Sequence, residues 1–383
     1  MHRIPATLFL LLSSTVISAA PALQMHVFES DQPAMSTTVL KHNLNDGQLS
    51  PARKHRLQTH VFEHATSTST NQNAIRSVTQ SSQAPVLAYQ TAEFYLNTGY
   101  RRDKLDWNTG LYFGTPNILS ELKWDNLKIA TINVGTTLLT PSNWVFNVDF
   151  VYGNIFSGKN QDSDYQGNNR TLEFSRSNNN ADKGMVIDGS VYAGHKWLSV
   201  HNDSAALYLT PKIGLSYHAQ FLRMTDGNQT FSRAVPEFGI PEAFPLGPFS
   251  GLNSTYDAAW YGPWIGLAGE VSVSKSINFY ADFEYHYAFF DATADWNLRS
   301  ERAHPESFTH KARGYGLVGS VGGNISLSSN LSLNASLDIQ KWKANKDGVR
   351  TLFLADGSSS QNVKFNEVNW HSFGANLGIT YEF

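Results

Sequence analysis

Hydrophobic and polar residues alternate along most of the chain from about Ala88 onward, with the period of two that indicates β-strands. The last strand shows this most clearly: the odd-numbered residues of 373–383 are apolar, and the even-numbered residues of 372–382 are small or polar. The same alternation recurs over 277–289 and 331–339. A succession of such segments predicts an all-β fold of antiparallel strands, each with one apolar face.

The connections between these segments are of two kinds, which alternate. Tight turns fall at 140–143, 201–204, 274–276 and 328–330, and longer polar connections near 106–116, 157–180, 225–255, 296–309 and 345–364. A soluble sandwich would have similar loops at both ends. Short periplasmic turns alternating with long outer loops are instead typical of bacterial outer-membrane barrels. The sequence therefore predicts a ten-stranded antiparallel transmembrane β-barrel over residues 88–383.

The residues ahead of the barrel divide into two segments. A positively charged start, an apolar stretch over 6–17 and small residues at 18–22 predict a signal peptide of residues 1–22. Residues 23–87 are polar and unpatterned, and we expect them to be disordered because they cannot bury enough apolar surface. A signal peptide followed by a transmembrane barrel predicts that the protein is located in the bacterial outer membrane.

Composition narrows the possible partners. The 383 residues contain no cysteine, so a closed barrel must supply the constraint that disulfides give many exported proteins. A net charge of -3 gives no reason to expect a nucleic-acid partner.

Charged residues on the polar faces of the strands should pair inside a narrow barrel and fill it, which argues against a wide pore. These residues are Asp149, Asp188, Lys196, Lys212, His218, Glu270, Asp282 and Glu284.

Two carboxylates in the second outer connection are the first candidate for chemistry. Asp162 and Asp164 are two residues apart and could hold a water molecule or a cation between them. Solvated surface is the plainer interpretation of such a pair in an asparagine-rich segment. A calcium loop is the alternative, from the spacing of Asp162, Asp164, Gln166, Gly167 and Glu173. That spacing lacks flanking helices, and Gln166 replaces the usual acidic ligand.

The fourth outer connection holds the second candidate, Asp291, Asp295 and Asn297. The alternation of the preceding strand would carry all three outward, so either they lie above the bilayer or a bulge re-aims them. His304 and His310 lie at the end of the same connection, where a solvated role is expected. The sequence contains no nucleophile elbow, phosphate-binding loop or metalloprotease helix, and we expect no cofactor.

Over roughly 88–383 the chain resembles the omptin family, which consists of ten-stranded outer-membrane barrels that act as surface endopeptidases. The segment Asn117-Ile-Leu-Ser-Glu-Leu-Lys-Trp124 is similar to the second strand of that family. The segment Pro263-Trp-Ile-Gly-Leu-Ala-Gly269 is similar to its sixth strand. The resemblance implies the same barrel and a site at its outer end.

The resemblance also implies four catalytic positions, which fall on Asp162, Asp164, Asp295 and Asn297. The family has a histidine at the fourth position. The aspartate at the third position holds this histidine, which helps to activate a water molecule. Asparagine cannot take up a proton near neutral pH, and losing a general base costs about 10²–10⁴ in rate. Thr293 stands where the family has an acidic residue that helps to bind basic side chains.

Three functions stay open at this point. The first is a non-proteolytic or altered omptin-like surface barrel, which acts through its outer loops in adhesion or in recognition of an extracellular protein or peptide. The second is an active endopeptidase in which another group, such as His304, replaces the missing base. The third is a porin-like channel. Outer-membrane lipid is the expected partner in each case, and the resemblance adds lipopolysaccharide as a candidate lipid.

Overall fold

The computed structural model describes residues 91–201, 206–274 and 276–383. The expected signal peptide and polar segment, 1–22 and 23–87, lie outside the described residues, as does most of the turn at 201–204. No helix in the described part of the chain is long and apolar enough to cross a membrane.

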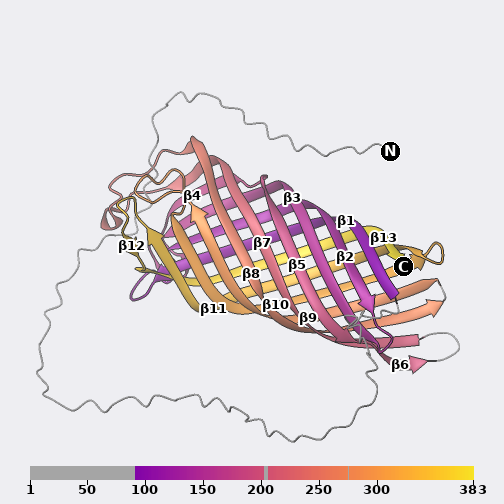
Figure 1. The fold of residues 1–383 in the computed structure, drawn as a ribbon. Helices are drawn as coiled ribbons and strands as arrows, with labels where there is room; N and C mark the ends of the chain where they lie inside the picture. Colours follow the sequence, from indigo (N-terminus) through magenta and orange to yellow (C-terminus); the bar gives the residue numbers. More distant parts are fainter. Residues whose placement is uncertain (1–90, 202–205, 275) are drawn as a thin grey trace, which may run out of the picture. The chain divides into compact units, whose positions relative to one another are not determined.

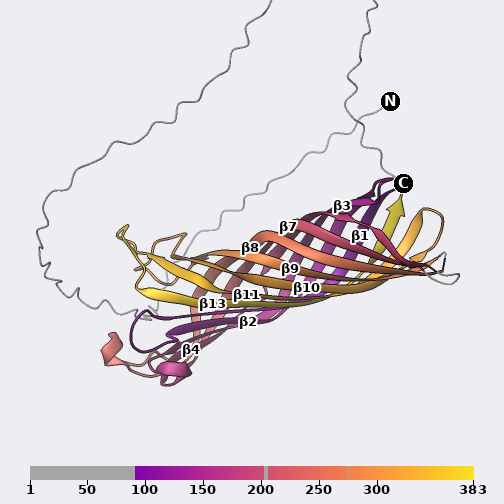
Figure 2. The same ribbon diagram turned by 90° about the horizontal axis from the view of Figure 1, so that it is seen from below.

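The described residues form thirteen strands. Their bounds are β1 Thr91–Leu111, β2 Ser120–Leu139, β3 Trp144–Tyr165, β4 Glu173–Asn180, β5 Gly184–His195, β6 Trp197–His201, β7 Ala206–Ser232, β8 Gly247–Ser274, β9 Ile277–Asp295, β10 Phe308–Ser326, β11 Leu331–Phe353, β12 Ser359–Ser360 and β13 Val363–Glu382. Two short 3-10 turns, η1 Asn168–Arg170 and η2 Pro236–Phe238, lie at the end of the sheet that carries the longer connections (Figure 2).

The strands join into one antiparallel sheet that closes on itself (Figure 1). The first and last strands close it: β1 pairs with β13 from Glu93 opposite Glu382 to Leu111 opposite Val363. The segments β4, β5 and β6 share one place between β3 and β7, and β12 is a two-residue strand beside β11. Among the described strands this leaves ten places around the ring, which confirms the predicted ten-stranded barrel.

The wall of the barrel presents an apolar band to the outside. Leu337, Ile339 and Phe373 are 49%, 62% and 50% exposed, while Ser372, which precedes Phe373 on β13, is buried. The odd-numbered residues of 331–339 and 373–383 therefore face outward, as the alternation predicts. A sheet whose outer face is a continuous apolar band matches the lipid-facing wall of an outer-membrane barrel.

Replacing Leu337 with arginine should lower the free energy of unfolding in lipid vesicles by roughly 2–4 kcal/mol, because the charge would lie in the lipid band. Ser336→Arg is the matched control, since Ser336 faces the lumen and its hydroxyl contacts the carboxylate of Asp338 at 3.3 Å. The introduced guanidinium can pair there. Denaturant titration of both variants measures the difference, and equal losses would show that the assigned facing is wrong.

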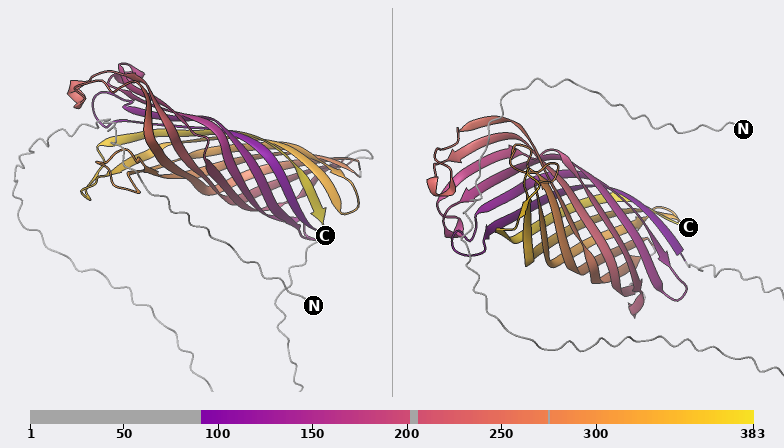
Figure 3. Two further views of the ribbon diagram at one scale, coloured as in Figure 1. Left: turned by 90° about the horizontal axis from the view of Figure 1, so that it is seen from above. Right: turned by 60° about the vertical axis from the view of Figure 1, so that its left-hand side comes forward.

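The outer connections are shorter than the sequence analysis expects. The described residues outside the strands at this end are 112–119, 166–172, 233–246, 296–307 and 354–362, apart from β12. The expectation that 157–180 and 225–255 are loops is wrong, because β3, β4, β7 and β8 extend through most of these ranges. Above the bilayer the outer face of a strand meets water instead of lipid, and the buried inner face of these extensions is largely polar, so the apolar alternation ends while the backbone ladder continues. Figure 3 shows these extensions at the looped end.

The core of the described structure lies inside the barrel, toward the looped end. It consists of aromatic side chains that are at most 2% exposed. They come from β1, β2, β8, β9, β10, β11 and β13 and include Trp107, Trp124, Tyr256, Trp260, Phe290, Phe308, Trp342, Phe365 and Trp370. Ring contacts link the set, with the centroids of Trp342 and Trp370 at 5.6 Å. We call this set the aromatic layer.

Candidate functional site

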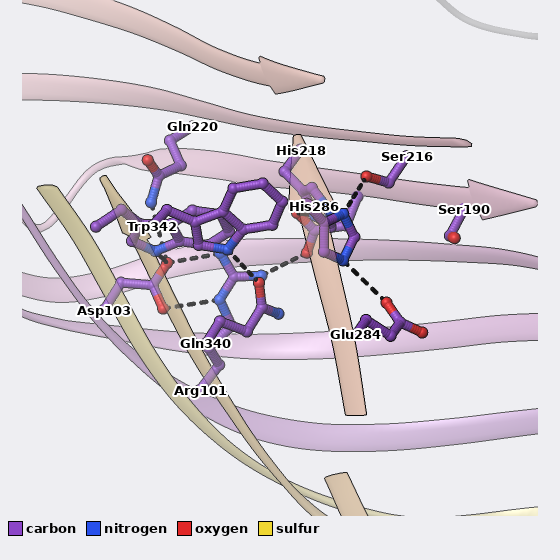
Figure 4. A network of polar contacts seen from close by, with 12 residues as sticks. Arg101, Asp103, Ser190, Ser216, His218, Gln220, Glu284, His286, Gln340 and Trp342 are labelled. Atoms are coloured by element: carbon purple, nitrogen blue, oxygen red, sulfur yellow. Dashed lines mark hydrogen bonds and ion pairs between the residues drawn. The ribbon is translucent and has the colours of Figure 1, made fainter. Parts of the chain in front are cut away.

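A network of ion pairs crosses the lumen beside the aromatic layer (Figure 4). Arg101 of β1 donates to Asp103 on the same strand and, at 2.5 Å, to Asp188 on β5. The ring of His218 contacts the other oxygen of Asp188 at 3.1 Å. The guanidinium of Arg101 also lies over the ring of Trp370, 5.2 Å from its centroid. The network therefore ties β1, β5 and β7 to the aromatic layer.

A second cluster continues the network on the side of β7 and β9. The ammonium of Lys212 pairs with the carboxylate of Asp282 and lies 3.3 Å from that of Glu284. His286 contacts both the hydroxyl of Ser216 and Glu284, each at 3.0 Å. The prediction that the inward charges pair is confirmed for these groups. It is likewise confirmed for Lys196 and Glu270, 2.7 Å apart.

Asp162 and Asp164 lie near the outer end of β3 and share its inner face, because alternate residues of a strand point the same way. Two cavities of about 40 Å³ each meet at this pair. Both are also lined by Trp296 and Arg299 of the β9–β10 connection. A cavity of this size has room for a few water molecules. The two carboxylates thus form a small polar site above the aromatic layer.

The electrostatic partners of this site are arginines. Burial raises the pKa of Asp162 to about 7, and the opposing influence of Arg299 and Arg350 does not cancel the effect of burial. Asp162 lies above the lipid band, whose last outward aromatic on β3 is Phe156. The guanidinium of Arg350 lies 4.3 Å from the ring centroid of Phe308, which holds the cation at the cavity wall.

Asp162 should make the stability of the protein depend on pH. Its folded pKa of about 7 lies above its ordinary value near 3.9, so the folded state binds more protons between these limits. Stability should therefore fall as pH rises from about 4 to about 7 and stay lower above that. Asp162→Asn should remove this fall, by about 1–3 kcal/mol, in denaturant titrations at several pH values. The exposed Asp125→Asn is the control, and equal pH profiles of both variants would contradict this role.

Asp295 belongs to a different environment. The strand β9 pairs with β10 without a bulge, so the alternation continues and Asp295 faces outward with Asp291. Its carboxylate contacts Nδ1 of His304 at 2.5 Å, and both side chains are partly exposed. Neither residue lines the two cavities at Asp162 and Asp164. The structure therefore brings Asp295 together with His304 and does not bring it to the aspartate pair.

Asn297 has a structural role at the edge of β8. Its side-chain oxygen accepts hydrogen bonds from the backbone N–H of Asn253, at 2.9 Å, and from the hydroxyl of Ser254. Its amide donates to the carbonyl of Gly251 at 2.7 Å. The pairing of β8 with β9 begins only at Thr255, so the Asn297 amide satisfies backbone groups of β8 that have no neighbouring strand on the β9 side. Asparagine suits this place because one side chain offers both a donor and an acceptor.

Asp162 and Asp164 lie on β3 opposite Ser177 and Ser175 of β4, so the calcium-loop spacing falls on a hairpin of two paired strands. Glu173 accepts a hydrogen bond from Arg176 at 2.8 Å.

The expectation that His310 is solvated is wrong. It is fully buried, and its ring stacks on Phe365 with the centroids 4.1 Å apart. Burial keeps the pKa of His310 well below its ordinary value, and the charge of Arg350 acts in the same direction. The alternation along β10 places His310 on the inner face with Phe308, and this was the available signal.

Several solved structures of other proteins match the fold of this chain. The outer membrane protease OmpT of Escherichia coli matches with a TM-score of 0.60 at 15% identity, over 78% of this chain and 99% of that chain. The translocator domain of the autotransporter NalP of Neisseria meningitidis has a TM-score of 0.29 at 11% identity, over 76% and 88%. OprG of Pseudomonas aeruginosa has a TM-score of 0.27 at 8% identity, over 78% and 99%. The match to OmpT supports the architecture alone, and the two weaker matches carry no argument.

Comparison with sequences gives the family. No curated protein matches the chain. The model of the family described as Pom, Protochlamydia outer membrane protein, matches residues 95–383, which is the barrel almost from its first strand to its last residue. This match agrees with the closed sheet and the apolar outer band, and it confirms the predicted location in the outer membrane of a Gram-negative bacterium. The chain belongs to the Protochlamydia outer membrane protein family.

Proposed function

We propose that the protein is a closed surface barrel that recognises an extracellular protein or peptide through its outer end, and that it is neither a channel nor an efficient protease. The filled lumen supports the first part of this proposal. The ion pairs of Arg101 and Lys212 and the aromatic layer occupy the path that a solute would have to take. Buried, paired charges of this kind are costly to displace.

The observation that carries the recognition role is the display of large apolar side chains beyond the lipid band. Phe113 in the β1–β2 connection is 93% exposed, Leu246 before β8 is 67% exposed, and Leu172 before β4 is 58% exposed. Exposed apolar residues outside the membrane commonly mark interaction sites.

The connections that carry these residues are fixed in place. Phe174, Val235 and Ile240 form a small core of their own under the β7–β8 connection. The backbone N–H of Asn117 donates a hydrogen bond to the side-chain oxygen of Asn168 at 2.8 Å, which ties the β1–β2 connection to η1. A ligand-binding surface that is already ordered loses less entropy on binding.

Adhesion of cells that display the full-length protein on their surface tests this function. Phe113→Ser combined with Leu246→Ser should reduce attachment to cultured host cells several-fold at equal surface expression. Glu242→Ser, an exposed polar residue of the same connection as Leu246, should leave attachment unchanged. Equal attachment by all three forms would contradict recognition through these residues.

One observation favours an endopeptidase as the second candidate. Asp295 and His304 form a carboxylate–imidazole contact at 2.5 Å, so a residue other than Asn297 supplies an imidazole held by the family-equivalent aspartate. A general base of this kind is able to activate water. Peptide cleavage by wild-type protein that is lost in both Asp162→Asn and His304→Gln would support this candidate. We expect no such cleavage, because Asp162 faces arginines and His304 lies outside its cavities.

A further inference from the structure

One of the two cavities at Asp162 and Asp164 has walls of opposite character. The wall formed by the inner faces of β3 and β4 is polar, and besides the aspartate pair it contains Ser175, Ser177 and Asn179. The facing wall comes from β8 and the β9–β10 connection, and its apolar side chains include Leu252, Trp296 and Leu298. A ligand that fills this cavity therefore needs one apolar face and one polar face.

The polar wall holds buried hydrogen-bonding atoms in fixed positions. Asn179 is 7% exposed, and its amide donates from Nδ2 to Oδ1 of Asn160 at 2.8 Å and to the hydroxyl of Ser177 at 3.2 Å. Within the described part of the chain, Oδ1 of Asn179 accepts no hydrogen bond, and the same holds for Oδ1 of Asp162. Buried acceptors are normally satisfied. A ligand with hydroxyl groups would supply the donors that these two oxygens lack.

The apolar wall is also fixed in place. The ring of Trp296 packs edge-to-face against Phe308 with the centroids 4.7 Å apart, and its backbone N–H donates to the hydroxyl of Ser307 at 2.9 Å. Trp296 and Leu252 pack against the aromatic layer but remain partly exposed. The negative face of an aromatic ring attracts polarised C–H groups. The C–H face of a sugar ring is therefore well suited to this wall.

The charges around the two cavities balance, which favours a neutral ligand. The arginines that line the cavities are Arg299, Arg302 and Arg350. The aspartate pair lines the same cavities, and Glu301 forms ion pairs with Arg299 and with Arg302. Among the described residues the site thus has as many acidic as basic side chains, so it favours neither a free cation nor a free anion.

The size of the site limits the ligand further. Each cavity of about 40 Å³ has room for about three water molecules, and the two adjoin at the aspartate pair. This space accepts a single sugar ring and is too small for a chain of them. A pyranose also has the required chemistry, since it has C–H groups on a face, hydroxyls around its rim and no charge.

We propose that the outer cavities bind one neutral pyranose, with its C–H face on Trp296 and its hydroxyls donating to Asn179 and Asp162. The hydroxyl of Ser175, which Gln229 contacts at 3.0 Å, is a further partner on the same wall. Because these side chains are already held by their neighbours, binding loses little side-chain entropy. The inference goes beyond the recognition role of Phe113 and Leu246 and uses other residues, so its failure would leave that role untouched.

Ligand-observed saturation-transfer NMR tests the proposal, with full-length protein in phosphatidylcholine nanodiscs and empty nanodiscs as background. The probes are the methyl glycosides of galactose, glucose, mannose and N-acetylglucosamine. At least one should receive saturation from wild-type protein, most strongly at ring C–H protons. Asn179→Leu and Trp296→Leu should each weaken its binding about tenfold, as expected for the loss of one good contact. Asn178→Leu removes the same amide from the next, exposed position of β4 and should bind like wild type.

The two binding-site variants lose different contacts, so the test does not depend on either one alone. Heat-modifiable migration in gels shows which variants are folded. Saturation of none of the four glycosides by wild-type protein would overturn the proposal, and so would equal binding by wild type and a folded Asn179→Leu or Trp296→Leu variant. Saturation of the cation agmatine in place of the sugars would overturn the neutral class of ligand, because the aspartate pair would then select charge.

Discussion

Replacing Arg101 with methionine is expected to lower the free energy of unfolding by about 3–5 kcal/mol, the usual cost of removing one partner of a buried ion pair. The change leaves the carboxylates of Asp103 and Asp188 buried without their cation. Asp103 would keep its contacts with Gln220, at 3.2 Å, and Trp370, at 3.1 Å, but neither carries a charge. Denaturant titration in lipid vesicles measures the loss.

Arg102→Met is the matched control, because Arg102 is the next residue along β1 and is exposed on the outer wall. It should unfold close to wild type. Adding Asp188→Asn to Arg101→Met should recover part of the stability, because an amide costs less to bury than a carboxylate. A loss in Arg101→Met no larger than in Arg102→Met would show that the ion pairs contribute little to the fold.

Truncating the aromatic layer should open the lumen. Trp342 and Trp370 are at most 1% exposed, and their stacked rings lie between the ion pairs and the outer cavities. Each tryptophan-to-alanine change should cost about 3–5 kcal/mol. The variant with both changes should conduct ions across planar bilayers, because the cavity left behind joins polar space on both sides. Wild-type protein should not conduct.

Phe373→Ala is the control for this experiment, since Phe373 has a similar aromatic side chain on the lipid-facing side of the wall. It should stay closed. A double tryptophan variant that folds and remains closed would show that the ion-pair network seals the lumen without the aromatic layer. Conductance of wild-type protein comparable to that of the variant would contradict the closed barrel itself.

The barrel could be predicted from the sequence because a lipid-facing wall imposes a strict pattern. Every second residue of 373–383 must be apolar, and a shift of one residue would expose the whole set to the wrong side. The same physics explains the errors at the outer end. The segments 157–165 and 225–232 are strands without a lipid-facing side, so nothing in their composition separates them from loops.

The candidate site could be predicted only in part. The inward facing of Asp188 follows from alternation along a single strand. Alternation from Phe146 to Phe156 would instead place Asp162 and Asp164 outward, and a register shift between β2 and β3 near Ser157 turns them inward. Their partners depend on the register between strands far apart in sequence, as in the contact of Arg101 with Asp188. The role of Asn297 depends on an edge of β8 that no local pattern reveals.

The closure of the ring by β1 and β13 has a consequence for how the protein folds. The pairing of Glu93 with Glu382 joins residues separated by almost the entire barrel sequence, and contacts of such high order form late and slowly. Until β13 is in place, β1 and β11 each present an unpaired strand edge that can template association with another chain. The interval between synthesis of β1 and delivery of the final strand is therefore when the chain is most prone to aggregate, and a chaperone that shields those two edges would protect it most.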